Sequence, residues 1–173
     1  MDNIILIGMP GCGKSTVGVL LAKLMGYDFI DTDLIIQHAE GKKLFEILRD
    51  SGSEYFSRLE NSVNKNLQAK RTVIATGGSV VYEKEAMEHL KSIGKVVYLE
   101  VSLGQLEKRI KNFATRGIRI EEGQTFRDLY LERLPLYKRY ADITVNCSRG
   151  SLQKNAEKIF DRLIKEGLIS ANL

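Results

Sequence analysis

Short apolar runs alternate along this chain with longer stretches in which apolar residues recur every three or four positions. The runs at 3–8, 28–30, 72–75, 95–100 and 143–146 are typical of strands, and the first of them indicates a buried strand. The periodic stretches and their capping signals predict helices at 15–25, 51–69, 83–92 and 151–166, with two more that begin near 102 and 125. Strands that alternate with helices indicate an α/β fold, in which helices cover both faces of a parallel sheet.

The 173 residues fit one domain, spanning 1–173, without a linker, repeat or low-complexity segment. No apolar run reaches the roughly eighteen residues of a membrane span, and the first residues lack the basic lead of a signal peptide. The two cysteines, Cys12 and Cys147, suggest neither a disulfide framework nor a zinc site. We therefore expect a cytoplasmic protein, without a membrane partner and monomeric.

The net charge of +4 is concentrated in one part of the chain. Residues 106–139 contain nine Lys or Arg against five acids, an excess equal to the whole net charge. Such a stretch can be a solvated helical face or a region that handles phosphate groups. Nucleic acid is not the expected partner, because the aromatic residues of this stretch do not form a base-stacking pattern.

The first strand-like run leads directly into a glycine-rich loop. Residues 8–15 read GMPGCGKS and match the pattern GxxxxGK(S/T) in full, between a predicted strand and a predicted helix. Glycines let such a loop curl so that backbone N–H groups point at phosphates, and the helix N-terminus favours anions. Lys14 is expected to reach the terminal phosphates of ATP, and Ser15 to bind Mg²⁺. The ATP-binding residues predicted here are Gly11, Cys12, Gly13, Lys14, Ser15 and Thr16, Cys12 through its backbone.

Two further groups of residues follow predicted strands, and ligands of parallel sheets bind at the carboxyl ends of strands. Asp31 and Asp33 can divide the work of holding a metal-bound water and an attacking hydroxyl, although either can instead cap the next helix. Gly77 and Gly78 allow a ligand to approach the backbone closely, or they form a plain turn.

The series GMPGCGKST at 8–16, DTD at 31–33, GG at 77–78 and RLPLY at 133–137 resembles the motif series of shikimate kinases, in order and spacing. The resemblance implies the three-layer P-loop NTPase fold of the nucleoside-monophosphate-kinase-like group. That fold has a five-stranded parallel sheet in the order 2-3-1-4-5, helices on both faces and a mobile lid, here about 113–123. It also implies phosphorylation of shikimate by ATP with Mg²⁺, within aromatic amino-acid biosynthesis.

The resemblance further assigns roles to single residues. Asp31 would hold the metal through water, and Asp33 would hold the acceptor hydroxyls and orient the nucleophile. Arg133 would pair with the acceptor carboxylate, although by itself it could equally be a surface helix residue. The backbone at Gly77 and Gly78 would contact the acceptor, Arg109 would lie near the nucleotide, and Arg116 would close over the phosphates. The catalytic residues would then be Lys14, Asp33 and Arg116.

Three positions depart from the family pattern, all on the acceptor or lid side. Ser57 stands where the family has an arginine for the acceptor carboxylate, and Arg58 comes one residue late, about 100° round a helix. Arg58 is still a candidate substrate-binding residue of the acceptor region, about 31–62. The lost hydrogen bond could cost about 1.5–3 kcal/mol of affinity. Ser79 replaces a third glycine of the family pattern. The lid reads RGIR at 116–119, which keeps the lid arginine but alters the apolar residues that usually follow it.

These departures keep other functions open. One is a related kinase with another small-molecule acceptor, of the gluconate or threonine type, which Ser57 favours. Another is a nucleotide-binding regulatory module without catalysis, against which the intact loop at 8–16 argues. A nucleoside monophosphate kinase fits less well, because of the RLPLY motif and the short acceptor region.

Overall fold

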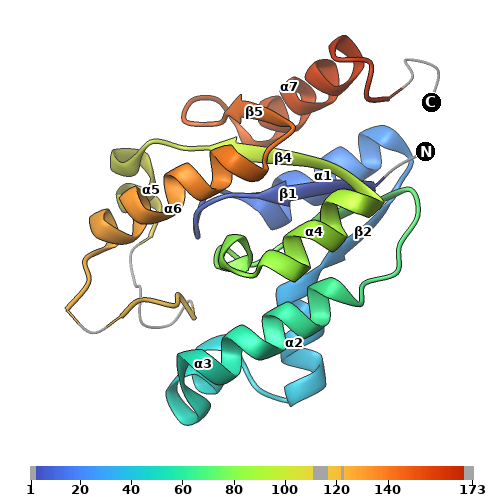
Figure 1. The fold of residues 1–173 in the computed structure, drawn as a ribbon. Helices are drawn as coiled ribbons and strands as arrows, with labels where there is room; N and C mark the ends of the chain where they lie inside the picture. The colour runs from blue at the N-terminus through green and yellow to red at the C-terminus, as the bar shows by residue number, and fades with distance from the viewer. Residues whose placement is uncertain (1–2, 111–116, 122, 170–173) are drawn as a thin grey trace.

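The computed structural model describes residues 3–110, 117–121 and 123–169. Its centre is a parallel five-stranded sheet in the order β2-β3-β1-β4-β5, as the sequence predicted (Figure 1). The strands are β1 (Asn3–Ile7), β2 (Asp28–Asp31), β3 (Thr72–Ala75), β4 (Gly94–Glu100) and β5 (Ile143–Asn146). Every residue of β1 is buried, because it lies between two neighbouring strands and beneath helices on both sides.

Helices cover the two faces of this sheet (Figure 1). They are α1 (Lys14–Met25), α2 (Thr32–Glu40), α3 (Leu44–Lys65), α4 (Lys84–Ile93), α5 (Leu103–Arg109), α6 (Phe126–Tyr140) and α7 (Leu152–Lys165), with a short 3₁₀ turn η1 (Val80–Tyr82). Helices α1 and α7 pack against each other on one face, and α4 and α6 lie against β4 on the other. Because the strands are parallel, their carboxyl ends lie at one shared end of the sheet, where α2 follows β2 directly.

The region between β2 and β3 differs most from the sequence prediction. Helix α2 was not predicted, and α3 begins at Leu44 rather than near 51. The Glu46 carboxylate caps α3 by accepting from the Lys43 backbone N–H at 2.8 Å. Gly52 interrupts the helix with φ 80°, a backbone conformation that glycine adopts without a steric penalty. The predicted helix from 51 is thus the second arm of a longer, kinked helix.

A second, smaller apolar core holds this region together. Ile36 of α2 packs with Ile47 and Phe56 of α3, separately from the main core under the sheet. As a result, the part of α3 that follows the kink places Phe56 and Glu60 beside the residues that follow β1 and β3, at the carboxyl ends of the strands.

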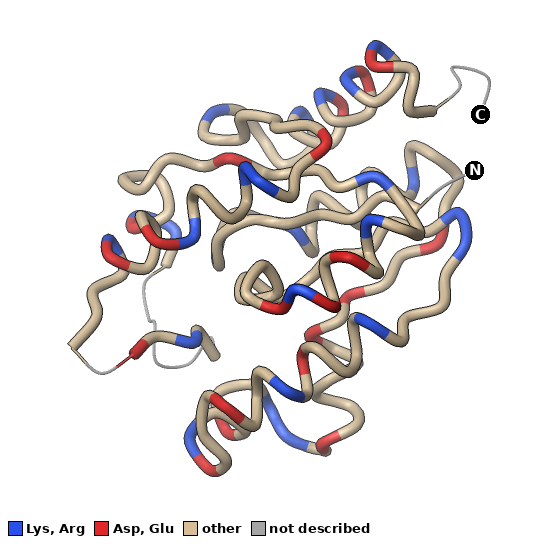
Figure 2. Tube along the Cα trace, viewed as in Figure 1, with Lys and Arg blue, Asp and Glu red and all other residues tan. Residues whose placement is uncertain are grey.

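Charged residues lie mainly on the helices (Figure 2). In α6 both acids precede Arg133, and the three charged residues from Arg133 onward are all basic, so part of the charge excess of 106–139 lies in the second half of this helix. Within the described residues, no helix combines the length and the apolar character needed to cross a membrane.

Candidate active site

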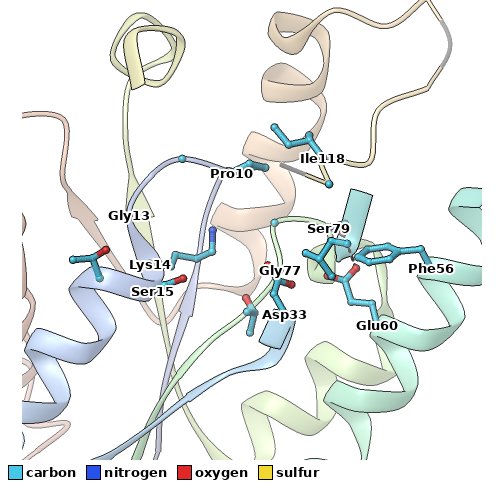
Figure 3. Close-up of a pocket in the computed structure, with 16 residues that line it drawn as sticks. Pro10, Gly13, Lys14, Ser15, Asp33, Phe56, Glu60, Gly77, Ser79 and Ile118 are labelled. Atoms are coloured by element: carbon cyan, nitrogen blue, oxygen red, sulfur yellow. Dashed lines mark hydrogen bonds between the residues drawn. The ribbon is translucent and has the colours of Figure 1, made fainter. Parts of the chain in front are cut away.

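A cavity of about 300 Å³ opens at the carboxyl ends of β1 and β3 (Figure 3). The loop 8–16 forms one wall and the residues after β3 form the floor. Helix α3 closes the opposite wall through Leu44, Phe56 and Glu60, and Gly117 and Ile118 lie over it. The predicted phosphate loop and the predicted acceptor residues thus face one shared space.

The phosphate loop ends at Gly13, which has φ 100° and forms the N-cap of α1 without a side-chain hydrogen bond. The first backbone N–H groups of α1 are therefore available to an anion, and the helix dipole favours one there. Lys14 is only 8% exposed, and its Nζ donates to the carbonyls of Gly8 at 2.8 Å and Met9 at 3.1 Å. Since both partners are neutral, the ammonium charge remains free to act on a phosphate. Ser15 and Thr16 line the same wall.

Cys12 and Arg109 support the loop from behind the cavity. The Cys12 side chain is fully buried and is not part of the cavity wall. Its carbonyl accepts from Arg109 Nη1 at 3.4 Å, while Arg109 Nη2 reaches the carbonyl of Cys147 at the same distance. Arg109 therefore connects α5 to the loop. A direct contact of either residue with ATP stays a prediction.

Asp33 points into the cavity, while Asp31 does not. Asp31 is the N-cap of α2, and its carboxylate accepts from the Asp33 backbone N–H at 3.0 Å. The Asp33 Oδ1 atom is buried and has no hydrogen-bond partner among the residues that the structure describes. Burial first, and then the charge of Asp31, raise the pKa of Asp33 from 3.8 to about 6, against the opposing charge of Lys14. A carboxylate with such a pKa is ionised at neutral pH and can still take up a proton.

Glu60 is a site residue that the sequence reasoning missed. It is fully buried, its Oε2 accepts from the Ser79 hydroxyl at 2.7 Å, and its Oε1 has no protein partner. Burial raises the pKa of Glu60 from 4.5 to about 8, although the Ser79 hydrogen bond acts in the opposite direction. Glu60 is therefore mostly protonated at neutral pH. The sequence signal was present, since Glu60 is one helical turn from Phe56, which also lines the cavity.

Because Gly77 has no side chain, the side chains of Glu60 and Asp33 can approach each other above its backbone. A Cβ at Gly77 would lie 2.2 Å from Glu60 Oε1 and 2.9 Å from Asp33 Oδ1. The two unpartnered oxygens therefore converge on one point above the Gly77 backbone (Figure 3). Hydroxyl groups of a ligand that approaches these two oxygens are suited to bind them, because a hydroxyl can donate to one oxygen and accept from a protonated one.

Arg133 lies inside the molecule, with 1% of its surface exposed, and is not a surface helix residue. Its Nε donates to the Tyr82 hydroxyl at 3.2 Å and its Nη2 to the Arg119 carbonyl at 2.9 Å. Its Nη1 lies 3.2 Å from the position that a Cβ on Gly78 would take, so it points toward the cavity floor. Tyr137, one turn further along α6, holds that floor by donating to the Gly78 carbonyl at 2.6 Å.

The candidate role of Arg58 needs a correction. Its side chain is 70% exposed and pairs with Glu54 at 3.2 Å, away from the cavity. The one-residue displacement from position 57 turns it to the solvent side of α3. Ser57 instead donates a short hydrogen bond to Glu83 Oε1. The predicted lid arginine, Arg116, lies outside the described residues, as do 113–115 and 122 of the predicted lid.

The residues present are compatible with Mg²⁺ bound largely through phosphates. Among residues 3–110, 117–121 and 123–169, no three His, Cys, Asp or Glu side chains are grouped closely enough to hold a metal. Mg²⁺ commonly uses few protein ligands and completes its shell with phosphate oxygens and water. The Ser15 side chain, beside Lys14 in the cavity wall, is suited to be one such ligand.

Known proteins resemble this chain over most of its length. The family model described as shikimate kinase matches residues 10–164. A protein named shikimate kinase from Thermodesulfovibrio yellowstonii is 37% identical over 162 residues, which cover 92% of this chain and 93% of that protein. One from Clostridium botulinum (strain Okra / Type B1) is 40% identical over 151 residues, with 84% and 88% coverage.

A solved structure with the same arrangement is the shikimate kinase from Acinetobacter baumannii in complex with shikimate. It is 33% identical, the TM-score is 0.90, and the match covers 98% of this chain and 96% of that one. The similarity therefore includes the sheet and the segments that build the cavity.

Proposed function

Because the chain belongs to the shikimate kinase family, we propose that it transfers the terminal phosphoryl group of ATP to the 3-hydroxyl of shikimate. One observation carries the proposal. Lys14 and Ser15 of the phosphate loop and Asp33 of the acceptor side line a single cavity, so donor and acceptor meet there.

In the transfer, the acceptor hydroxyl oxygen bonds to the γ-phosphorus while the bond from phosphorus to the leaving oxygen of ADP breaks. The transition state is loose, so the protein mainly positions the reactants and neutralises charge. Lys14 and the N–H groups at the start of α1 neutralise the phosphates. Asp33 orients the hydroxyl and receives its proton, which a carboxylate with a pKa of about 6 can do near neutral pH.

The acceptor is held between the floor and α3. Asp33 Oδ1 and Glu60 Oε1 bind neighbouring hydroxyls above Gly77. Arg133 is buried, and its hydrogen bonds to described residues go to neutral oxygen atoms, so it attracts the acceptor carboxylate beside Gly78. The acceptor-binding site therefore has one end that binds hydroxyl groups and another end that binds a carboxylate.

ATP is the phosphoryl donor of this family, and Mg²⁺ is the metal we propose with it. Ser15 would hold the metal directly. Asp31 caps α2 and does not line the cavity, so it would act on the metal only through a bridging water. The bound metal would neutralise charge on the β- and γ-phosphates. We further propose that Arg116 closes over the phosphates within a lid at about 113–123, and that Arg109 and Cys12 stay close to the nucleotide.

The remaining proposals concern the protein in the cell. Buried, unpaired Cys12 and Cys147 suit a reducing cytoplasm. We propose a monomer in which the single domain 1–173 contains both binding regions. A gluconate- or threonine-type acceptor is not favoured, since the relatives that are 37% and 40% identical over 92% and 84% of this chain are named shikimate kinases.

The proposal is tested by measuring ADP release with shikimate beside a panel of hydroxy acids and sugar acids. We expect turnover with shikimate, and we expect Lys14→Ala to abolish it because the phosphates lose their cation. Lys23→Ala, an exposed change in the same helix, is the matched control and should retain activity. Turnover of another acid without turnover of shikimate would disprove that shikimate is the acceptor. Full activity of Lys14→Ala would disprove that the loop 8–16 binds the phosphates of ATP.

A further inference from the structure

We infer that Arg119 supplies a second guanidinium to the acceptor carboxylate, opposite Arg133. The inference rests on the proposed function, since it concerns how that acceptor is recognised. No motif of the chain marks Arg119, and it is the tertiary contacts that single it out.

The first observation is that Arg133 is a buried cation without an anion. Within the described parts of the chain no Asp or Glu forms an ion pair with it, and its hydrogen bonds go to the neutral Tyr82 hydroxyl and Arg119 carbonyl. A buried guanidinium is costly unless a negative group compensates it. Its Nη1 faces Gly78 and the cavity. Its charge also acts on Glu60, but that carboxyl group is mostly protonated at neutral pH, so a ligand anion is the group that can compensate Arg133.

The second observation is that Arg119 and Arg133 share one aromatic ring. The guanidinium carbon of Arg133 lies 5.1 Å from the centroid of Tyr82, and that of Arg119 lies 5.5 Å from it. The Arg119 carbonyl is also bonded to Arg133, which fixes the backbone between them. A carboxylate with two oxygens can pair with two such guanidinium groups at once.

The third observation concerns the present partner of Arg119. Its Nη1 lies 3.4 Å from Glu83 Oε1, longer than the 2.7–2.9 Å that is typical of a charge-assisted hydrogen bond. The same Glu83 oxygen already accepts from the Ser57 hydroxyl. Glu83 therefore keeps a partner when Arg119 turns to the acceptor, and the exchange leaves no carboxylate without a hydrogen bond.

The position of the segment completes the case. Gly117 and Ile118, which precede Arg119, line the cavity, and a Cβ at Gly117 would lie 2.5 Å from Leu44 of α3. The backbone before Arg119 is thus held against the acceptor wall. Ser57, on that same helix, carries no charge. Arg119 contacts the same Glu83 oxygen as Ser57, so it is a cation placed next to the Ser57 position.

The test compares Arg119→Ala and Arg119→Lys with the wild type, using shikimate and an analogue whose carboxylate is replaced by a hydroxymethyl group. We expect Arg119→Ala to raise the KM for shikimate roughly ten- to a hundredfold, with a smaller rise for Arg119→Lys, which keeps the charge. The KM for the carboxylate-free analogue should not change. Arg127→Ala, an exposed arginine of α6, is the control and should match the wild type.

The outcomes separate this inference from the proposed function. If the wild type does not phosphorylate shikimate, the proposed function fails. If it does, and Arg119→Ala leaves the KM for shikimate unchanged or raises it equally for both acceptors, Arg119 does not bind the carboxylate. A thermal unfolding midpoint for each variant shows whether the protein compared is folded.

Discussion

At Gly77 the acceptor site depends on the absence of a side chain. Glu60 Oε1 and Asp33 Oδ1 occupy the space where a Cβ would stand, and both oxygens lack a protein partner. The environments of the two carboxyl groups also give them different pKa values, because the pKa of Asp33 is raised to about 6 and that of Glu60 to about 8. One carboxylate is thus ready to accept a proton while its neighbour still holds one.

We predict that Gly77→Ala disturbs both carboxyl groups. The added methyl group would lie 2.2 Å from Glu60 Oε1, so the floor or α3 must shift. Such overpacking costs about 1–3 kcal/mol of unfolding free energy. Displacement of one acceptor hydrogen bond raises the KM for shikimate roughly tenfold.

Urea unfolding and acceptor kinetics measure these two effects. Gly104→Ala is the control, because a Cβ there meets no atom within 4 Å and the helix α5 gains an alanine. Wild-type stability and KM in Gly77→Ala would contradict the close approach of these groups.

At the scale of elements, α6 carries Arg133, the residue proposed to bind the acceptor carboxylate. Arg133 and Tyr137 are four residues apart, so they lie on the same buried face, one beside Gly78 and the other bonded to its carbonyl. The helix begins at a reciprocal capping box, in which the Asp128 N–H donates to Thr125 Oγ1 and the Thr125 N–H donates to Asp128.

We predict that Thr125→Ala lowers the free energy of unfolding by about 0.5–2 kcal/mol, because the first turn of α6 loses its cap. For a chain of this length, each kcal/mol corresponds to about 2–4 °C in the thermal midpoint. Ser102→Ala at the N-cap of α5 is the control, since Ser102 makes no side-chain capping bond. Equal midpoints for the two variants would show that the Thr125 cap does not stabilise the fold.

At the scale of the whole molecule, the buried carboxyl groups make the stability depend on pH. The pKa of Glu60 is about 8 in the folded chain and near 4.5 when it is exposed by unfolding. Between these values the native state holds a proton that the unfolded chain releases. The free energy of unfolding therefore falls as the pH rises through this window.

We predict that Glu60→Gln flattens this dependence between about pH 6.5 and 8, above the pKa of Asp33. Glutamine does not titrate, so the slope should become less negative by up to about 1.4 kcal/mol per pH unit. Urea unfolding at several pH values measures the slope, independently of any constant loss of stability in the variant. Parallel profiles for wild type and Glu60→Gln would show that Glu60 is not the group that titrates.

The sequence by itself determined the layers, the sheet order through its family resemblance, and the phosphate loop. The layers and the phosphate loop depend on local chemistry: apolar runs form buried strands, and a glycine-rich turn before a helix exposes backbone N–H groups. It also placed Asp33, Gly77 and Gly78 at strand ends, where the structure brings them to one cavity.

Only the tertiary structure decided which further side chains complete the acceptor site. Glu60 and Arg119 come from separate parts of the chain. No periodicity reports that Glu60 bonds Ser79, or that Arg119, which we propose for the acceptor carboxylate, contacts Glu83. The kink at Gly52 and the direction of Arg58 likewise depend on how α3 packs, because one residue along a helix turns a side chain by about 100°. Contacts between distant segments are set by the packing of whole elements, which the order of residues does not reveal.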